Sequence, residues 1–251
     1  GWVYDESGRC IRFPAHPEQT PPAKAHAIVY QVQVKYDLVW VCLGEPANDV
    51  PPFPEWEDDA FAMAACGPYP HLKAHGPRLI ENFLDAAHFP FVHEGVLGDP
   101  NQPEIGEYET HTGPDGVVSD PVAVFQPNPY GDAAGAVTYT YRAYRPLTAH
   151  LLKHSPNATN GLLLTITPHD ELDSTAWFVI ATTIMDDNEA LEREYEPRIR
   201  AIFEEDQLIV EGQRPELLPL DLQEELHLRS DRMAIAYRQW LGELGLKFGT
   251  S

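Results

Sequence analysis

The chain contains the segment 81-ENFLDAAHFPFVH-93, in which two histidines, His88 and His93, lie five residues apart in an otherwise apolar run. On a regular helix, positions five apart are rotated by about 140° from each other, so the two imidazoles would not face one ion. Pro90 removes a backbone donor and disfavours the helical conformation at Phe89, so we expect the helix to break, kink or bulge between the histidines. Such a break would bring the imidazoles together, and the segment therefore predicts a metal site.

Two polar residues precede the first histidine at helical spacing. Asn82, Asp85 and His88 are three residues apart and would share one helical face. One interpretation is a core helix with two incidental histidines. However, a buried Asp85 beside two histidines is costly unless a positive charge lies nearby, and a divalent cation would supply that charge.

A third ligand is predicted from a later amphipathic segment. Residues 199–213 fit a helix, and Asp206 lies in the middle of its inward stripe. The predicted stripe consists of Ile199, Ile202, Phe203, Asp206, Ile209, Val210 and Gln213. The acids Glu204, Glu205 and Glu211 fall on the other side and are expected to face solvent. Two histidines and one carboxylate form the facial triad that leaves iron positions open, although spacing alone does not distinguish iron from zinc.

These motifs resemble a known family. The pattern Asn82-x-x-Asp85-x-x-His88-x-x-x-x-His93, with the later block 203-FEEDQLIVEGQR-214, resembles the catalytic domain of the Rieske non-haem iron aromatic oxygenases. Within this family it looks like the α subunits that demethylate or hydroxylate aromatic compounds, such as vanillate and dicamba demethylases and phenoxybenzoate dioxygenase. The resemblance extends over nearly the whole chain, since residues 2–10, 38–44 and 51–54 look like the second half of a Rieske domain and its exit linker.

The resemblance implies a role for each motif residue. His88, His93 and Asp206 would hold a mononuclear Fe(II). Asp85 would hydrogen-bond a ligating histidine and, across a subunit boundary, a histidine of a neighbouring Rieske cluster. Asn82 would lie near the iron as a supporting polar group. An orienting carboxylate makes physical sense, because a ligating histidine usually donates its second N–H to such a group.

The chain departs from the family at the Rieske cluster. The cluster is held by two cysteines and two histidines, in this family as C-x-H followed by C-x2-H, and neither motif occurs around Cys10, Cys42 or Cys66. The pair Gly1-Trp2 resembles residues that follow the second motif directly. We therefore expect a longer polypeptide whose intact form carries a [2Fe-2S] cluster.

Composition excludes several other classes of protein. Acidic residues outnumber basic ones by 39 to 17, giving a net charge of −22 that would repel a nucleic-acid backbone. No run approaches the roughly 18 apolar residues needed to cross a membrane. Three scattered cysteines fit a reducing cytoplasm. A chain of 251 residues with 43% hydrophobic residues can bury a substantial core.

The pattern of strands and turns predicts an α+β fold. Residues 1–48 are expected to be the end of an all-β Rieske-type domain, 49–60 a proline-rich linker, and 61–251 the catalytic domain. Successive strands without intervening helices indicate an antiparallel sheet. The predicted strands are residues 1–4, 27–34, 38–43, 106–111, 116–125, 136–144, 161–168 and 175–183. Helices are expected at about 188–213, interrupted near Pro197, and at 222–241. A curved sheet covered by helices, the helix-grip arrangement of the family, would enclose an apolar cavity.

Two further histidine pairs have a spacing of four residues. His71 and His75 lie among Pro68, Pro70 and Pro77, and His150 and His154 lie between Pro146 and Pro156. Neither pair has a secure helix to display it, so we do not predict a metal site at either. Both are expected to be exposed or edge histidines.

Together these observations predict a terminal oxygenase. It would use Fe(II), dioxygen and electrons from NAD(P)H, delivered by a reductase or ferredoxin and a Rieske cluster, to hydroxylate or O-demethylate an aromatic substrate. A homotrimer is implied by the family alone. Two alternatives are a metal-free module that binds a hydrophobic ligand in the same fold, and a zinc hydrolase. The latter is disfavoured because no Glu follows the first histidine as in H-E-x-x-H.

Overall fold

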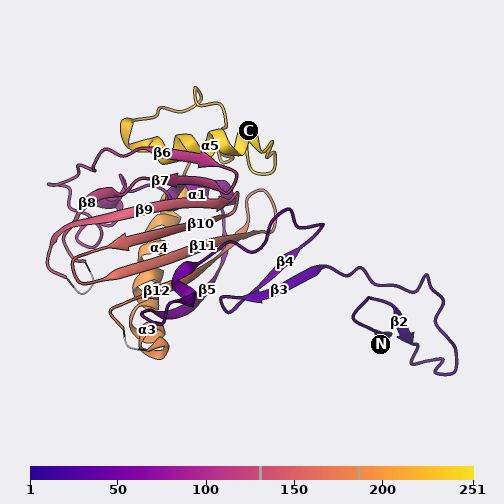
Figure 1. The fold of residues 1–251 in the computed structure, drawn as a ribbon. Coiled ribbons are helices and arrows are strands. Elements are labelled where there is room, and N and C mark those ends of the chain that lie inside the picture. Colours follow the sequence, from indigo (N-terminus) through magenta and orange to yellow (C-terminus); the bar gives the residue numbers. More distant parts are fainter. Residues whose placement is uncertain (130–131, 186) are drawn as a thin grey trace. The chain divides into compact units, whose positions relative to one another are not determined.

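The computed structural model describes residues 1–129, 132–185 and 187–251 (Figure 1). The chain divides into two compact units, Gly1–Val50 and Pro51–Ser251. Within the described ranges, none of the helices combines the length and the apolar character that crossing a bilayer requires.

The first unit consists of two short hairpins. Its strands are β1 (Val3–Tyr4), β2 (Cys10–Arg12), β3 (Gln31–Lys35) and β4 (Leu38–Cys42). β1 pairs with β2 and β3 with β4, both antiparallel. Tyr36 and Asp37 turn the second hairpin with φ of 58° and 56°, the left-handed conformation that a two-residue hairpin loop requires. The strand predicted from residue 27 begins only at Gln31.

The second unit is built on one antiparallel sheet. Its strands are β5 (Ala62–Leu72), β6 (Thr110–Gly113), β7 (Gly116–Ser119), β8 (Val122–Gln126), β9 (Gly135–Arg145), β10 (Thr148–His154), β11 (Thr159–Pro168) and β12 (Ser174–Thr182). Their order is β5-β12-β11-β10-β9-β7-β6, and β8 also pairs with β9. Side chains alternate along β9, so that Val137, Tyr139, Tyr141 and Ala143 are buried on one face.

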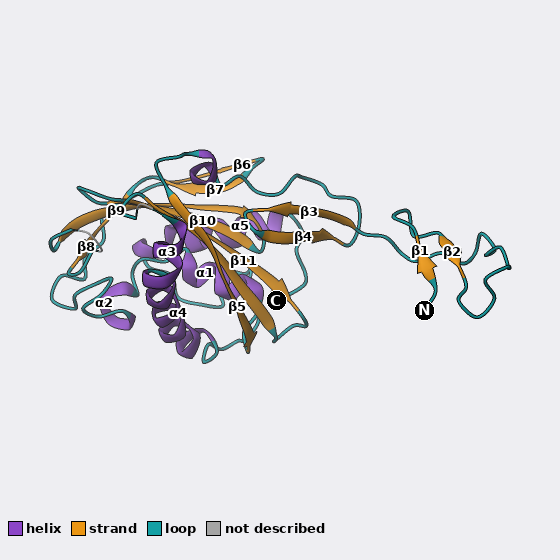
Figure 2. Ribbon diagram, turned by 90° about the horizontal axis from the view of Figure 1, so that it is seen from below, coloured by secondary structure: helices purple, strands orange, loops and turns teal. Residues whose placement is uncertain are grey.

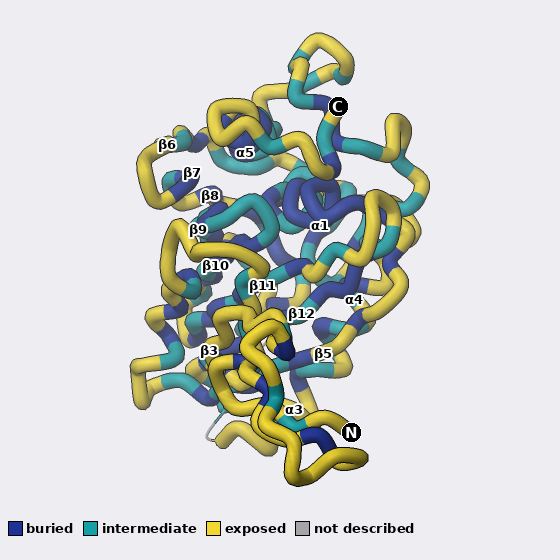
Figure 3. Tube along the Cα trace, turned by 90° about the vertical axis from the view of Figure 1, so that its right-hand side faces the viewer, coloured by how far each residue is buried: buried dark blue, intermediate teal, exposed yellow. Residues whose placement is uncertain are grey.

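The helices cover this sheet. They are α1 (Gly76–Phe83), α2 (Phe89–Val92), α3 (Asn188–Glu194), α4 (Glu196–Val210) and α5 (Arg232–Glu243), with short 3₁₀ turns η1 (Pro54–Glu57) and η2 (Arg229–Asp231). α1 contacts β10 and β11, α3 contacts β5, and α5 contacts β6 and β7. Figures 1 and 2 show α4 running across one face of the sheet, and Figure 3 shows α1 deeply buried. The predicted α+β fold with an antiparallel sheet covered by helices is confirmed.

Proline explains several differences from the predicted elements. The strand predicted at 116–125 is two strands, β7 and β8, divided at Pro121, which cannot donate a hydrogen bond to a sheet. β5 was not predicted because it contains Pro68 and Pro70, which an edge strand such as β5 tolerates. The helix interruption falls at Tyr195, so that Pro197 lies in the first turn of α4, where its missing N–H costs nothing.

Other boundaries also shift. The helix predicted from residue 222 begins at Arg232, after η2. The strand predicted at 106–111 is β6, which begins at Thr110. β10 was not predicted at all. Within the second unit the proline-rich stretch is packed rather than free: Phe53 and Glu55 are buried, and Glu55 Oε1 lies 3.3 Å from His150 Nε2.

Candidate metal centre

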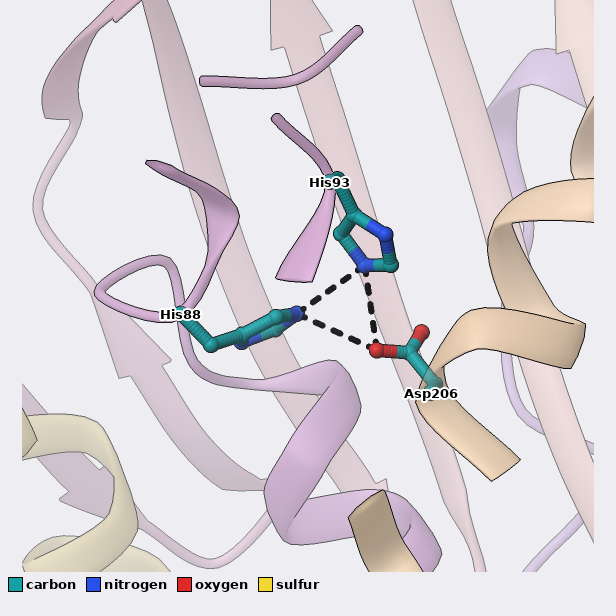
Figure 4. Close-up of side chains that lie close together, drawn as sticks. All are labelled: His88, His93 and Asp206. Carbon is teal, nitrogen blue, oxygen red and sulfur yellow. Dashed lines mark hydrogen bonds and ion pairs between the residues drawn. The ribbon is translucent and has the colours of Figure 1, made fainter. Parts of the chain in front are cut away.

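Three side chains predicted as metal ligands converge in the second unit (Figure 4). His88 Nε2 lies 3.3 Å from His93 Nε2 and 3.3 Å from Asp206 Oδ1. His93 Nε2 lies 3.0 Å from the same carboxylate oxygen. All three ligand atoms are within 4.8 Å of one another, which is close enough for one ion to contact each. We call this cluster of His88, His93 and Asp206 the metal end.

A broken helix carries the two histidines, but the break is not where the sequence predicts it. α1 ends at Phe83, and Asp85 then accepts hydrogen bonds from the backbone N–H groups of Ala87 and His88, each at 3.0 Å. The single helical turn α2 lies between the histidines, with Pro90 in its first turn. A proline is tolerated there because the first N–H groups of a helix have no partner within it. The expected break between the histidines is therefore wrong; it precedes His88.

The third ligand comes from the middle of α4. Phe203 and Val210 on the same helix are buried, and the Asp206 side chain is only 13% exposed. The inward stripe is narrower than predicted, since Ile209 is 48% exposed. An acid on the buried side of a helix is costly without a partner, and the facing imidazoles supply one.

Both imidazoles are oriented by carboxylates at their other nitrogen. His88 Nδ1 lies 2.8 Å from Asp85 Oδ2, and His93 Nδ1 lies 2.7 Å from Glu205 Oε2. When each Nδ1–H donates to its carboxylate, each Nε2 is left with a lone pair directed toward the ion position. The arrangement therefore sets the tautomer that a metal ligand needs.

Glu205 was expected to face solvent, and that expectation is only half right. Its side chain is 51% exposed, yet its carboxylate reaches the fully buried His93. One residue step turns a helix by about 100°, so the position before an inward acid lies at the edge of the buried face. The position of Glu205 directly before Asp206 was therefore the sequence feature from which its contact with His93 could have been predicted.

The remaining predicted residue, Asn82, is half-buried at the end of α1 and lines the cavity beside the metal end. Asn82, Asp85 and His88 also line a second cavity, together with Arg78 and Arg238. The other histidine pairs do not converge on a site. His75 and His150 are buried while His71 and His154 are exposed.

The charges of the metal end fit a divalent cation. Burial opposes the ionised form of Asp206, but the two neighbouring histidines lower its pKa to about 2. Burial likewise opposes protonation of His88, but the carboxylates of Asp206 and Asp85 raise its pKa to about 9. Asp206 Oδ1 is buried between the two Nε2 atoms and has no other donor among the described residues. A cation in place of the histidine proton would satisfy this oxygen, and metal binding would release that proton.

The cavity next to the metal end is mostly apolar. Its apolar walls include Leu79, Phe83, Phe89, Leu97, Leu151, Leu162, Leu164, Phe178, Ile199, Ile202, Phe203 and Val210. Polar residues also line it, among them Gln126, Lys153, Asn160 and Arg198. None of these four was singled out from the sequence. An apolar cavity with a few polar groups is typical of a small-molecule site.

Comparison with known proteins identifies the family. Residues 72–247 match the model of the vanillate O-demethylase oxygenase C-terminal domain. "Probable methylxanthine N7-demethylase NdmC" from Pseudomonas sp. (strain TJI-51) is 32% identical over 223 residues, which cover 86% of this chain and 78% of that protein. This chain belongs to the Rieske-type aromatic oxygenases, as the catalytic domain of an α subunit.

Further similar proteins and solved structures support the assignment to this family. Methylxanthine N1-demethylase NdmA from Pseudomonas putida is 29% identical over 97% of this chain and 68% of that protein. The solved structure of NdmA with caffeine superimposes with a TM-score of 0.81 at 27% identity, covering 97% of this chain and 70% of the other. Dicamba monooxygenase, at 16% identity and a TM-score of 0.71, shares the fold.

Membership in this family favours one of the functions predicted from the sequence over the others. The chain is an oxygenase component that hydroxylates or demethylates aromatic compounds, which favours this function over the metal-free ligand-binding module. The family implies iron and a Rieske cluster.

Proposed function

We propose that His88, His93 and Asp206 hold one Fe(II), at which this oxygenase hydroxylates or demethylates a small aromatic molecule bound in the adjacent cavity. One observation carries the proposal: three ligand atoms converge within 4.8 Å, and both histidines are oriented by carboxylates. Two histidines and one carboxylate are the ligand set of non-haem Fe(II) oxygenases. Bound iron would supply open positions for dioxygen activation.

The chain's own residues would orient and protect the reaction. Asp85 and Glu205 would keep the histidines in the ligating tautomer. Phenylalanines of α1, α2 and α4 line the cavity, and they would hold an aromatic ring beside the metal end while excluding water. Asn82 would contribute a polar group at the cavity edge.

We infer that the reaction removes a methyl group from oxygen or nitrogen. The similar proteins include methylxanthine N-demethylases and a dicamba O-demethylase. Inserting one oxygen atom into such a methyl C–H bond gives a hydroxymethyl group, which leaves as formaldehyde. Dioxygen, two electrons and two protons balance this step, and the second oxygen atom leaves as water.

The electrons would come from a reductase or ferredoxin through a [2Fe-2S] cluster in the intact protein. In a homotrimer, Asp85 would connect His88 of one subunit to the cluster of its neighbour. The position of Asp85 supports this role, because it contacts His88 and also lines the second cavity.

Nitric oxide binding to iron tests the ligand assignment. The chain is loaded with Fe(II) without oxygen, and the high-spin iron–nitrosyl signal is measured by EPR. His88→Ala and Asp206→Ala should each abolish the signal. The matched controls are His111→Ala and Asp120→Ala, because these residues form an exposed pair 3.0 Å apart and should leave the signal unchanged. A signal that survives in both metal-end variants would defeat the assignment.

Formaldehyde release tests the reaction. The intact oxygenase, supplied with its reductase and a methylated aromatic compound, should release one formaldehyde per demethylated product. Ring hydroxylation without formaldehyde would retain the iron site but overturn the demethylation.

A further inference from the structure

The cavity contains a second group of polar side chains, which we call the donor end: Lys153, Asn160 and Arg198. Lys153 lies on β10, Asn160 on β11 and Arg198 on α4. Lys153 pairs in register with Asn160 on one side and with Tyr139 on the other. Residues directly opposite on neighbouring strands project from the same face. Lys153 and Asn160 therefore lie side by side on the cavity face of the sheet, and Arg198 lines the same cavity from α4.

Asn160 is held in one orientation with its donor unused. The side chain is fully buried, and its Oδ1 accepts hydrogen bonds from Thr182 Oγ1 at 2.7 Å and from Tyr195 Oη at 3.2 Å. With the oxygen occupied twice, the amide nitrogen is fixed on the opposite side. That Nδ2 is buried and has no hydrogen-bond partner among the described residues. An unsatisfied buried donor is destabilising, so its persistence in a cavity wall indicates a ligand acceptor.

Lys153 adds an uncompensated charge beside this amide. The residue is 6% exposed, and within the described part of the chain its ammonium has neither a hydrogen bond nor an ion pair. Burial and the nearby Arg198 lower the pKa of Lys153 to about 8, while Asp132 opposes that shift. Asp132 is already engaged by Ser155 and Asn157. A buried cation without a partner is costly.

The charged residues that line the donor end of the cavity, as far as the structure describes it, are both positive. Among the described residues that line the cavity, Asp206 is the only carboxylate, and it faces the two histidines. Arg198, which also donates to the carbonyl of Asn128, adds a second positive charge beside Lys153. This local positive charge contrasts with the net charge of the whole chain, which is −22. Lys153 and Arg198 therefore line a cavity whose one carboxylate among the described residues already contacts two histidines.

We propose that the donor end binds an anionic group on the aromatic substrate, a carboxylate or a sulfonate, while the ring occupies the apolar part of the cavity. The inference rests on the proposed function for the chemistry at the metal end, but not for the binding itself. Lys153 would supply the charge and Asn160 Nδ2 a directional hydrogen bond, and both are specificity-determining rather than catalytic. Charge-assisted hydrogen bonds of this kind are about twice as strong as neutral ones.

Matched probes separate charge from shape. The probes are 4-methoxybenzoate, 4-methoxybenzenesulfonate and the neutral 4-methoxybenzamide, and their binding to the iron-free chain is measured by calorimetry. The wild type should bind at least one of the two anions about tenfold or more tightly than the amide, which corresponds to about 1.4 kcal/mol. Whether the carboxylate or the sulfonate binds more tightly identifies the anion.

Substitutions of Lys153 test whether this residue causes the preference for anionic over neutral probes. Lys153→Met should reduce anion affinity about 10- to 100-fold and leave amide affinity nearly unchanged, since a hydrogen bond to a charged group contributes about 1.5–3 kcal/mol. Lys153→Arg should keep most of the preference because it keeps the charge. The matched control is Lys73→Met, an exposed lysine outside the cavity that should have no effect. Equal binding of acids and amide, a preference that survives Lys153→Met, or no anion binding at millimolar concentration would each overturn the proposal.

The test distinguishes this inference from the proposed function. A chain that binds the acid at Lys153 but forms no iron nitrosyl retains the anion site and loses the iron site. A chain that forms the nitrosyl but binds acid and amide equally retains the oxygenase site and loses the anion site.

Discussion

At the metal end of the cavity each charged group has a partner, whereas at the donor end no carboxylate of the described residues lines the cavity beside Lys153. Asp206 lies 3.0–3.3 Å from two imidazoles, and each imidazole has its own carboxylate at the other nitrogen. Lys153 has no such partner among the described residues. The first arrangement persists as an ion-paired cluster until a metal replaces a proton. The second stays electrostatically unfavourable until an anion arrives.

This difference has a consequence for mutation. Removing a charged group from the metal end should damage the site, because its partners are then left buried and uncompensated. Removing the charge of the donor end should relieve an existing cost. The same kind of substitution, charge to neutral at similar volume, should therefore have opposite effects at the two ends.

The largest effect is expected for Asp206→Asn. The variant keeps the side-chain shape but removes the negative charge that a divalent cation needs, so Fe(II) affinity should fall by more than about 100-fold, beyond the range typical of outer partners. Affinity is measured by anaerobic titration with metal analysis of the dialysed protein. Retention of stoichiometric iron would show that Asp206 is not a ligand.

A smaller loss is expected for Glu205→Gln. The amide cannot replace the carboxylate that His93 Nδ1 contacts at 2.7 Å, so iron affinity should fall about 10- to 100-fold. Glu204→Gln is the matched control, since Glu204 is an exposed acid one position earlier on the same helix. If both variants bind iron equally well, the contact between Glu205 and His93 does not orient the ligand.

The metal end was largely predictable from the sequence because its signals are local. The spacing of His88 and His93 around Pro90, and one acid in an apolar helical stripe, identify three side chains that the structure brings together. Glu205 was missed because an exposed position on a charged helix resembles ordinary surface. Its contact with His93 depends on how α4 packs, which no local pattern encodes.

The donor end could not be predicted in the same way. Lys153 lies on β10, a strand that its flanking prolines concealed, and its proximity to Asn160 depends on the register between β10 and β11. Register is set by pairing across the sheet, since a shift of one residue would turn Lys153 to the opposite face. The residues of β10 alone do not specify which residue of β11 lies opposite Lys153.

At the donor end, Lys153→Met should stabilise the iron-free protein. Methionine has a similar length and no charge to bury, so the free energy of unfolding at pH 7 should rise by about 1–3 kcal/mol. Lys73→Met, at an exposed position, should stay within about 0.5 kcal/mol of the wild type. Chemical denaturation measures both. A destabilised Lys153→Met would mean that the lysine already has a stabilising partner in the free protein.

The smallest expected effect is a pH dependence of the stability gained by Lys153→Met. Burial and the nearby Arg198 lower the pKa of Lys153 in the folded chain from its ordinary value of 10.5 to about 8, while Asp132 opposes that shift. Between these values the unfolded state binds more protons than the folded state, so the stability contributed by this group rises with pH. Lys153→Met has no ammonium to titrate. The amount by which its free energy of unfolding exceeds that of the wild type should therefore decrease as pH rises from 7.5 to 10, without falling to zero. Other titrating groups are common to both proteins and cancel in the difference. Parallel stability curves would show that Lys153 titrates alike in the folded and unfolded chain, and the gain from Lys153→Met would then not come from removing a buried charge.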